Sequence, residues 1–169
     1  MKNSFKQFWI IVFITVIIFS ACGNEPDNFF SINGITYRLY KGEMYYKGPV
    51  IPDRSNNIEL YLFYEDENDY EEIFLDLYIP DGNNRLVEGT YNLTYNYEPF
   101  TCSYGEIQIE KDRRLLFYYR ITGGTLQVSV TGSGDDAIYT INIDCNIEDQ
   151  NGLTETVRGT YRGTIAWFE

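Results

Sequence analysis

The sequence predicts an all-β domain, an antiparallel barrel of about eight to ten strands, with a β-sandwich as the alternative. Three observations lead to this prediction. The 169 residues include 16 tyrosines but only 3 alanines, a composition that favours strands over helices. After residue 28, apolar side chains alternate with polar ones at a period of two, and no long stretch shows the period of a helix. Turn signals recur at short spacing, as in antiparallel sheets.

In the first half of the chain, a hairpin forms around Asn33-Gly34, a pair typical of type I′ turns. Acidic or Gly/Pro/Asn-rich segments separate the later strands and predict a loop over 47–57 and turns over 65–69 and 80–84. The predicted strands are 30–32, 35–40, 58–64, 73–79 and 88–97.

The second half is more regular. Two strands flank a turn at Lys111–Arg114 as a hairpin, and further turns are predicted over 132–136 and 149–152. One long final strand carries Val157 and Trp167 on the same face. The predicted strands before it are 105–110, 115–121, 123–132 and 138–147.

The first 22 residues have the pattern of an export signal. Lys2 and Lys6 precede an apolar run over Phe8–Phe19, and Phe19-Ser20-Ala21-Cys22 resembles a bacterial lipobox, in which the cysteine is lipidated after cleavage. The alternative is a transmembrane helix, but the run is shorter than the ~20 residues that span a bilayer. Cys22 is therefore the predicted lipid-attachment residue.

The predicted organisation is a signal peptide over 1–21, a tether over 22–28 and a single β-domain over 29–169. Removal of the signal takes away two lysines and no acid, which leaves 11 basic against 25 acidic side chains and a net charge of −14. Such a charge argues against a nucleic-acid partner. The chain has no histidine, which excludes Ser-His-Asp and Cys-His catalysis and histidine metal sites.

Two cysteines remain once Cys22 carries lipid. An exported domain permits a disulfide between Cys102 and Cys145, whose loop of about 44 residues would contribute ~4 kcal/mol in the chain-entropy model. The alternative is two unpaired thiols, with Cys145 acting as a small buried apolar residue. The sequence leaves both readings open.

The tyrosines are the candidate ligand-binding side chains, because a flat ring with a hydroxyl suits sugars and amphipathic ligands. In each adjacent pair, one ring must point away from the core. The alternative is cross-strand packing on a wet face. The candidate ligand-facing aromatics are Tyr45, Tyr46, Tyr95, Tyr97, Tyr118 and Tyr119.

The acidic residues predict no catalytic or metal site, and no cofactor is expected. One cluster is compatible with Ca²⁺, but it lacks EF-hand spacing and is better explained as a solvated hairpin turn. A carboxylate-pair hydrolase is an alternative for which the sequence indicates no particular pair. The cluster comprises Glu65, Asp66, Glu67, Asp69, Glu71 and Glu72.

Three segments carry a family resemblance: LVEGTYNLTY (86–95), ITGGTLQVSVTGSGDDAIYTINIDC (121–145) and DQNGLTETVRGTYRGTI (149–165). Together they resemble small secreted lipoproteins of Bacteroidota, most of them of unknown function. The resemblance implies an all-β, lipocalin-like (calycin-like) domain on the outer membrane, and no catalytic residues.

The expected function is a lipid-anchored, non-enzymatic protein of the cell envelope. It would contact the membrane through its N-terminal lipid and bind a ligand or an envelope protein through its aromatic-rich β-domain. The alternative is a structural or accessory subunit of a surface complex, or an adhesin, without a small-molecule pocket.

Overall fold

The computed structural model describes residues 28–169, so the predicted signal peptide, Cys22 and nearly all of the tether lie outside the described residues. The described chain is all-β, as predicted, and its eleven strands belong to one sheet. A single-turn 3₁₀ segment, Gly134–Asp136, interrupts the loop after β8. The strands are β1 (Phe29–Ile32), β2 (Ile35–Arg38), β3 (Lys41–Ile51), β4 (Ser55–Glu65), β5 (Tyr70–Pro80), β6 (Gly89–Tyr95), β7 (Thr101–Lys111), β8 (Arg114–Thr131), β9 (Ile138–Asp149), β10 (Thr154–Gly163) and β11 (Ala166–Phe168).

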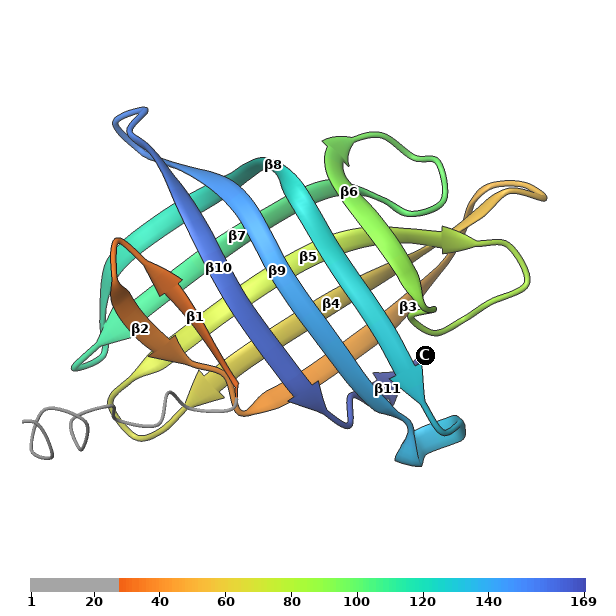
Figure 1. Cartoon of the computed structure of the whole chain (residues 1–169), viewed down its shortest axis with the longest axis horizontal. Helices are drawn as coiled ribbons and strands as arrows, with labels where there is room; N and C mark the ends of the chain where they lie inside the picture. The colour runs from red at the N-terminus through yellow and green to blue at the C-terminus, as the bar shows by residue number, and fades with distance from the viewer. Residues whose placement is uncertain (1–27) are drawn as a thin grey trace, which may run out of the picture.

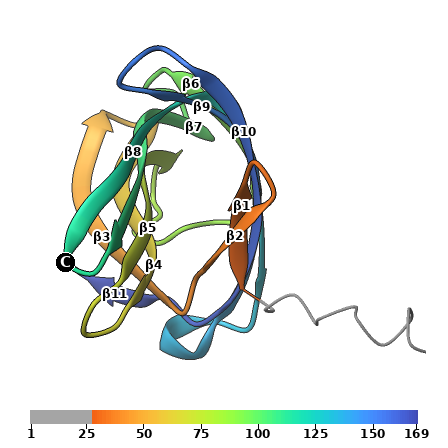
Figure 2. The ribbon, with the colours of Figure 1, turned by 90° about the vertical axis from the view of Figure 1, so that its left-hand side faces the viewer.

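The sheet curls into a barrel-like shape with two walls. Its strand order is β11-β3-β4-β5-β7-β6-β8-β9-β10-β1-β2, with an additional β7–β8 pairing. Figure 1 shows β3, β4, β5 and β7 running across β8, β9 and β10, and Figure 2 shows the curl that brings these two groups face to face. We call β11, β3, β4, β5 and β7 the groove wall, and β9, β10, β1 and β2 the opposite wall.

The core lies between the walls and follows the period-two alternation of the sequence. Leu60 on β4 and Leu75 on β5 are at most 1% exposed, and Ile143 on β9 is similarly buried. Each such side chain contributes about 1.5–3 kcal/mol when it leaves water. Because one face of every long strand is committed to this core, the alternate residues must lie on the outer face.

The last strand joins the two walls at one end. β11 follows β10 after Thr164 and Ile165, and it pairs in parallel with β3. Gly42 on β3 permits this approach, because a Cβ there would lie 2.9 Å from Ile165 Cγ1 and 3.0 Å from the Tyr161 hydroxyl. The single long final strand predicted from the sequence is therefore wrong: the chain breaks away from the opposite wall to reach β3.

One strand takes part in both walls. The predicted strands 115–121 and 123–132 form a single strand, β8, whose first part pairs with β7 and whose second part pairs with β6. The register with β9 shifts between Ile121 and Gly123, and Gly124 has a φ of +116°. A Cβ at Gly124 would lie 2.4 Å from the Asp144 carbonyl oxygen, so only glycine fits at this bend.

The predicted loop over 47–57 is also wrong. β3 extends to Ile51 and β4 begins at Ser55, so only three residues form the turn. Glycine and proline in this segment suggested a loop. However, β11 pairs with β3 only as far as Tyr45, so beyond that residue β3 is an edge strand. Proline, which has no backbone N–H to donate, is tolerated at position 49 because no strand pairs with that edge. A register shift between Tyr46 and Gly48 absorbs the irregularity.

Two hairpin predictions are confirmed. Asn33 and Gly34 join β1 to β2, and both have positive φ, as type I′ turns require. Asp112 and Arg113 join β7 to β8 with φ values of 52° and 61°. The eleven strands exceed the expected eight to ten because β3 was not predicted and β11 is separate from β10, although two predicted strands merge into β8.

Candidate functional site

A row of aromatic rings crosses the outer face of the groove wall. The rings come from alternate positions, opposite the core residues of the same strands, and neighbouring rings pack edge-on, tilted or stacked with centroids 4.8 to 6.0 Å apart. These separations are typical of favourable aromatic pairs. The row runs over β11, β3, β4, β5 and β7 to the start of β8, through Phe168, Tyr45, Tyr61, Phe74, Tyr104 and Tyr118.

Carboxylates alternate with the rings and accept hydrogen bonds from them. The Tyr45 hydroxyl donates to Glu43 over 2.8 Å, and the Tyr61 hydroxyl donates to Glu59 over 3.3 Å. Each pair is two residues apart on one strand, so both members point to the same face. The cross-strand register places Glu43 opposite Tyr61 and Tyr45 opposite Glu59, which makes a chequered pattern of acids and rings.

The same pattern continues on β5 and β7. The Tyr70 hydroxyl donates a short hydrogen bond to Glu72. The Tyr104 and Tyr118 hydroxyls both donate to Glu106. Tyrosine–acid pairs therefore extend over most of the groove wall.

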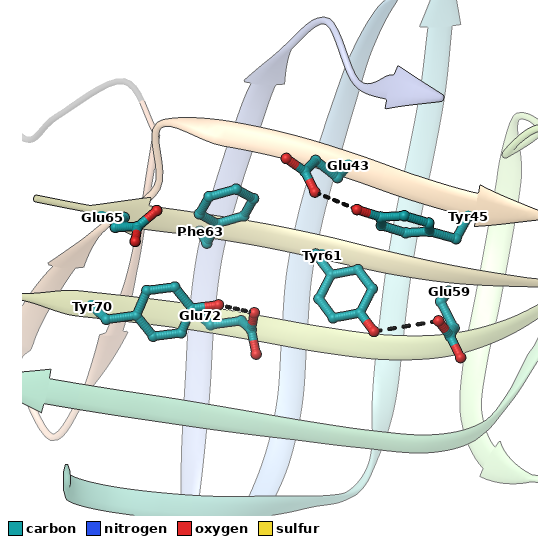
Figure 3. Close-up of a pocket in the computed structure, with 8 residues that line it drawn as sticks. All are labelled: Glu43, Tyr45, Glu59, Tyr61, Phe63, Glu65, Tyr70 and Glu72. Atoms are coloured by element: carbon teal, nitrogen blue, oxygen red, sulfur yellow. Dashed lines mark hydrogen bonds between the residues drawn. The ribbon is translucent and has the colours of Figure 1, made fainter. Parts of the chain in front are cut away.

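Part of this surface is hollowed into a groove of about 450 Å³, within the range of small-molecule sites. Figure 3 shows the lining side chains standing on β3, β4 and β5, with the strands of the opposite wall behind the sheet. We call this the aromatic–acidic groove. Its lining residues are Glu43, Tyr45, Glu59, Tyr61, Phe63, Glu65, Tyr70 and Glu72.

Burial and negative charge shift the pKa values of the groove. Desolvation, followed by the Glu59 charge, raises the pKa of Tyr61 to about 12. The hydrogen bond to Glu43 raises the pKa of Tyr45. Desolvation also raises the pKa of Glu72, which is only 9% exposed, and the charges of Glu106 and Glu43 act in the same direction. The tyrosines are thus neutral donors, and Glu72 is a poorly solvated acid.

The six candidate tyrosines separate into three groups. Tyr45 lines the groove, and Tyr118 lies at the far end of the aromatic row. Tyr46 and Tyr119 instead pack against the core, because each follows an outward-facing tyrosine on its strand.

Tyr95 and Tyr97 lie away from the groove. Tyr95 is 54% exposed, and its ring faces the Arg120 guanidinium at 4.8 Å. Tyr97 packs edge-on against Tyr78, with centroids 5.3 Å apart.

Most of the groove was not predicted from the sequence. Glu65 and Glu72 were assigned only to the acidic turn cluster. The lining residues that were not singled out at all are Glu43, Glu59, Tyr61, Phe63 and Tyr70. A signal was nevertheless present: an acid and a tyrosine recur two residues apart in EMY (43–45), ELY (59–61), YEE (70–72) and YGE (104–106). In a strand this spacing places both side chains on one face.

The acidic cluster of the β4–β5 turn divides among three environments. Asp66 accepts hydrogen bonds from the backbone N–H groups of Asn68 and Asp69 and caps the turn. Lys111 pairs with Asp69 at 3.0 Å and with the buried Glu71. Glu72 faces the groove instead. Among residues 28–169, no group of three acidic, histidine or cysteine side chains is arranged to hold a metal ion.

The two cysteines are free, buried thiols in the structure. Cys102 lies on β7 and Cys145 on β9, and burial raises the pKa of each to about 12. Of the two readings that the sequence left open, the structure has the two unpaired thiols and not the disulfide.

The chain was compared with known proteins at three levels. No protein-family model, curated protein or solved structure matches it. Within residues 28–169, no helix has the length and apolar character needed to cross a membrane.

Proposed function

We propose that this chain is a lipid-anchored, non-enzymatic protein of the cell envelope that binds a ligand in the aromatic–acidic groove. The anchor rests on the lipobox-like pattern ending at Cys22. The binding role rests on one observation above all: a groove of about 450 Å³ that concentrates four aromatic rings and four carboxylates on an outer sheet face.

The position of these rings on the outer face, where they add nothing to the core, supports a binding role. A sheet needs apolar residues only on its core face, and the outer face of β9 carries short polar and charged side chains instead. Exposed aromatic surface in a hollow is typical of binding sites. The rings of the groove therefore serve contact with another molecule better than they serve the core.

The hydrogen bonds of the groove support binding rather than acid catalysis. Glu43, Glu59 and Glu72 each accept a tyrosine hydroxyl, which fixes the carboxylates as acceptors. A general acid must instead hold a proton aimed at a leaving group. The groove thus presents fixed acceptors beside flat apolar faces.

The anchor is tested by fractionation of cells that express Cys22→Ser. The variant should move from the membrane fraction to the soluble fraction, while the wild-type chain stays with the membrane. Retention of the variant in the membrane fraction would refute the lipid anchor.

Binding is tested by equilibrium dialysis of the full chain in detergent against a mixed library of glycans, amines and peptides, with mass spectrometry of the retained compounds. At least one compound should be retained by wild type and lost in Tyr61→Leu. Tyr40→Leu is the matched control, because Tyr40 is 74% exposed and does not line the groove. Retention that Tyr61→Leu leaves unchanged would exclude the groove, and cleavage of a retained glycan would support a carboxylate hydrolase instead.

A second candidate function, a structural or accessory subunit of a surface complex, is favoured by one apolar patch. Leu115, Leu116 and Phe117 are 53%, 53% and 43% exposed at the start of β8, next to an irregularity in the β7–β8 pairing. Leu115→Ser with Leu116→Ser should then abolish a complex seen on native gels of envelope extracts. An unchanged gel pattern, or no complex with the wild-type chain, would remove support for this alternative.

A further inference from the structure

We propose that the ligand of the aromatic–acidic groove is a linear aliphatic polyamine, a small organic polycation. This inference rests on the proposed function and specifies the ligand class of the same site. It follows from the charge of the groove, the alternation of rings and acids, and the burial of one carboxylate, that of Glu72.

The negative charge of the groove is only partly compensated. Four of its eight lining residues are glutamates and none is basic. Lys47 forms an ion pair with the lining Glu59, with Nζ 3.5 Å from the carboxylate oxygen, and Lys41 Nζ lies 5.8 Å from the centre of the Phe63 ring. One ion pair does not balance four glutamates, so the groove keeps a negative charge. A cationic ligand would relieve the mutual repulsion of the carboxylates, which a neutral ligand cannot do.

The chequered pattern matches an extended cation better than a point charge. Across β4 and β5 the register pairs Phe63 with Glu72 and Glu65 with Tyr70. Along one strand of this face, neighbouring side chains are about 6.8 Å apart, and a carboxylate is followed by a ring, as in Glu43 and Tyr45. The two lining acids of β4, Glu59 and Glu65, are about 20 Å apart, with two rings between them. A polyamine also alternates charged and apolar groups, because three or four methylenes separate its ammonium groups. The methylenes can pack on the rings while the ammonium groups meet carboxylates and ring faces.

A divalent metal ion fits less well, because it needs several oxygens around one point. Among residues 28–169, the acids of the groove do not converge in this way. The rings that separate the carboxylates prevent such a cage and at the same time provide apolar contact area. The geometry therefore favours an organic cation.

Glu72 gives the observation that points most directly to a cation. The side chain is only 9% exposed, and one carboxylate oxygen accepts the hydrogen bond from Tyr70. Among the described residues, no other hydrogen-bond donor reaches this carboxylate. Figure 3 shows its second oxygen turned away from Tyr70. This oxygen is not one of the fully buried polar atoms without a partner, so it opens toward the groove. An ammonium group would give it a donor and a counter-charge together.

The test is isothermal titration calorimetry of the full chain in detergent with spermine at low ionic strength. We expect one spermine per chain with a Kd in the micromolar range. Glu72→Gln and Tyr61→Leu should each weaken binding about tenfold, since each removes a charged or cation–π contact. Tyr61→Phe keeps the ring and should stay within about threefold of wild type.

Three controls separate this proposal from general charge attraction and from misfolding. Glu148→Gln removes an exposed acid on β9 and should leave the Kd unchanged. Mg²⁺ in excess should displace no more spermine than NaCl at the same ionic strength, which measures the effect of screening alone. The urea midpoint of each variant shows whether it is folded.

Several results would overturn the inference. They are an absence of spermine binding to the wild-type chain, an equal loss in Glu148→Gln and Glu72→Gln, or equal displacement by Mg²⁺. If a neutral glycan such as cellohexaose is held in a Tyr61-dependent way while spermine is not, the polyamine inference fails and the proposed binding function stands. If no compound of any class depends on Tyr61, both fail.

Discussion

The two walls of the barrel have similar inner faces and very different outer faces. On the inner side, Leu60 of β4 and Ile143 of β9 are both buried in one core. On the outer side, β4 presents Tyr61 between Glu59 and Phe63, whereas β9 presents short polar and acidic residues such as Asn142. The same alternation thus produces a common core and two unlike surfaces, so the outer positions carry the information about function.

The contacts on the two outer faces also differ in kind. On the opposite wall, the Thr160 hydroxyl donates to Asn142 over 3.2 Å, and Arg158 lies 3.7 Å from Asp144 with both side chains largely exposed. Such contacts contribute little to stability. The aromatic row of the groove wall instead packs ring against ring over several strands, and the proposed ligand would lie on this row.

The largest expected effect concerns the bend that couples the walls. Gly124→Ala should destabilise the fold by more than about 3 kcal/mol or prevent folding, because a strained φ combines with a backbone clash at 2.4 Å. Gly34→Ala is the matched control: φ is +77°, no atom lies within 4 Å of the added Cβ, and the cost should be about 1 kcal/mol. Urea unfolding measures both. Equal costs would show that the bend of β8 is not a point of close contact.

The next effect tests whether the walls share one core. Leu60→Ala and Ile143→Ala should each lower the free energy of unfolding by about 2–5 kcal/mol, since each leaves a cavity in a packed interior. Urea denaturation of both variants gives the comparison. A cost below about 1 kcal/mol at only one of the two positions would contradict a common core.

A smaller effect should distinguish the outer faces. Phe74→Leu removes ring contacts with Tyr61 at 4.8 Å and Tyr104 at 6.0 Å, and it should cost about 1 kcal/mol. Asn142→Ala on the opposite wall should stay within about 0.5 kcal/mol. Thermal or urea unfolding of the pair measures the difference, which vanishes if the aromatic row adds nothing to stability.

The smallest effect is a pH dependence that arises from Glu72 on the groove wall. Burial raises the pKa of Glu72 above its ordinary value, with the charges of Glu43 and Glu106 acting in the same direction and the hydrogen bond from Tyr70 opposing them. The native state therefore binds the proton more tightly than the unfolded state. The stability that this proton contributes is present at low pH and is lost as pH rises through the raised pKa.

Replacement of Glu72 by Gln should remove this dependence. Measured by urea unfolding from pH 4 to pH 7.5, the stability of Glu72→Gln relative to wild type should rise with pH. Glu148→Gln, which changes an exposed acid on the opposite wall, should run parallel to wild type. Parallel curves for both variants would show that Glu72 is not desolvated.

Much of the fold could be predicted from local pattern, because turns and alternation are local properties. Asn33-Gly34 predicted a hairpin correctly, and the period-two alternation predicted strands where the structure has β4, β5 and β9. The errors arose where a distant neighbour overrides the local signal. Pro49 suggested a loop, yet it lies in a strand, because no neighbouring strand on that edge of β3 needs a hydrogen bond from a backbone N–H at this position.

The groove was predicted only in part for a similar reason. Tyr45 was a candidate because an adjacent pair of tyrosines forces one ring outward. Glu72 was assigned to an acidic turn cluster, and its neighbours Asp69 and Glu71 do lie there with Lys111. Only the pairing of β3, β4 and β5 shows that Glu72 belongs with Tyr61 and the other residues of the groove.

The sequence by itself determined that this protein is all-β, strongly acidic and free of histidine, and it predicted a lipid anchor at Cys22. These properties follow from composition and from patterns within a few residues. Tertiary structure alone decided that the sheet curls into two walls, that Cys102 and Cys145 are buried free thiols, and that rings and carboxylates from three strands line one groove. The physical reason is register: which residues meet across neighbouring strands depends on how the whole sheet pairs.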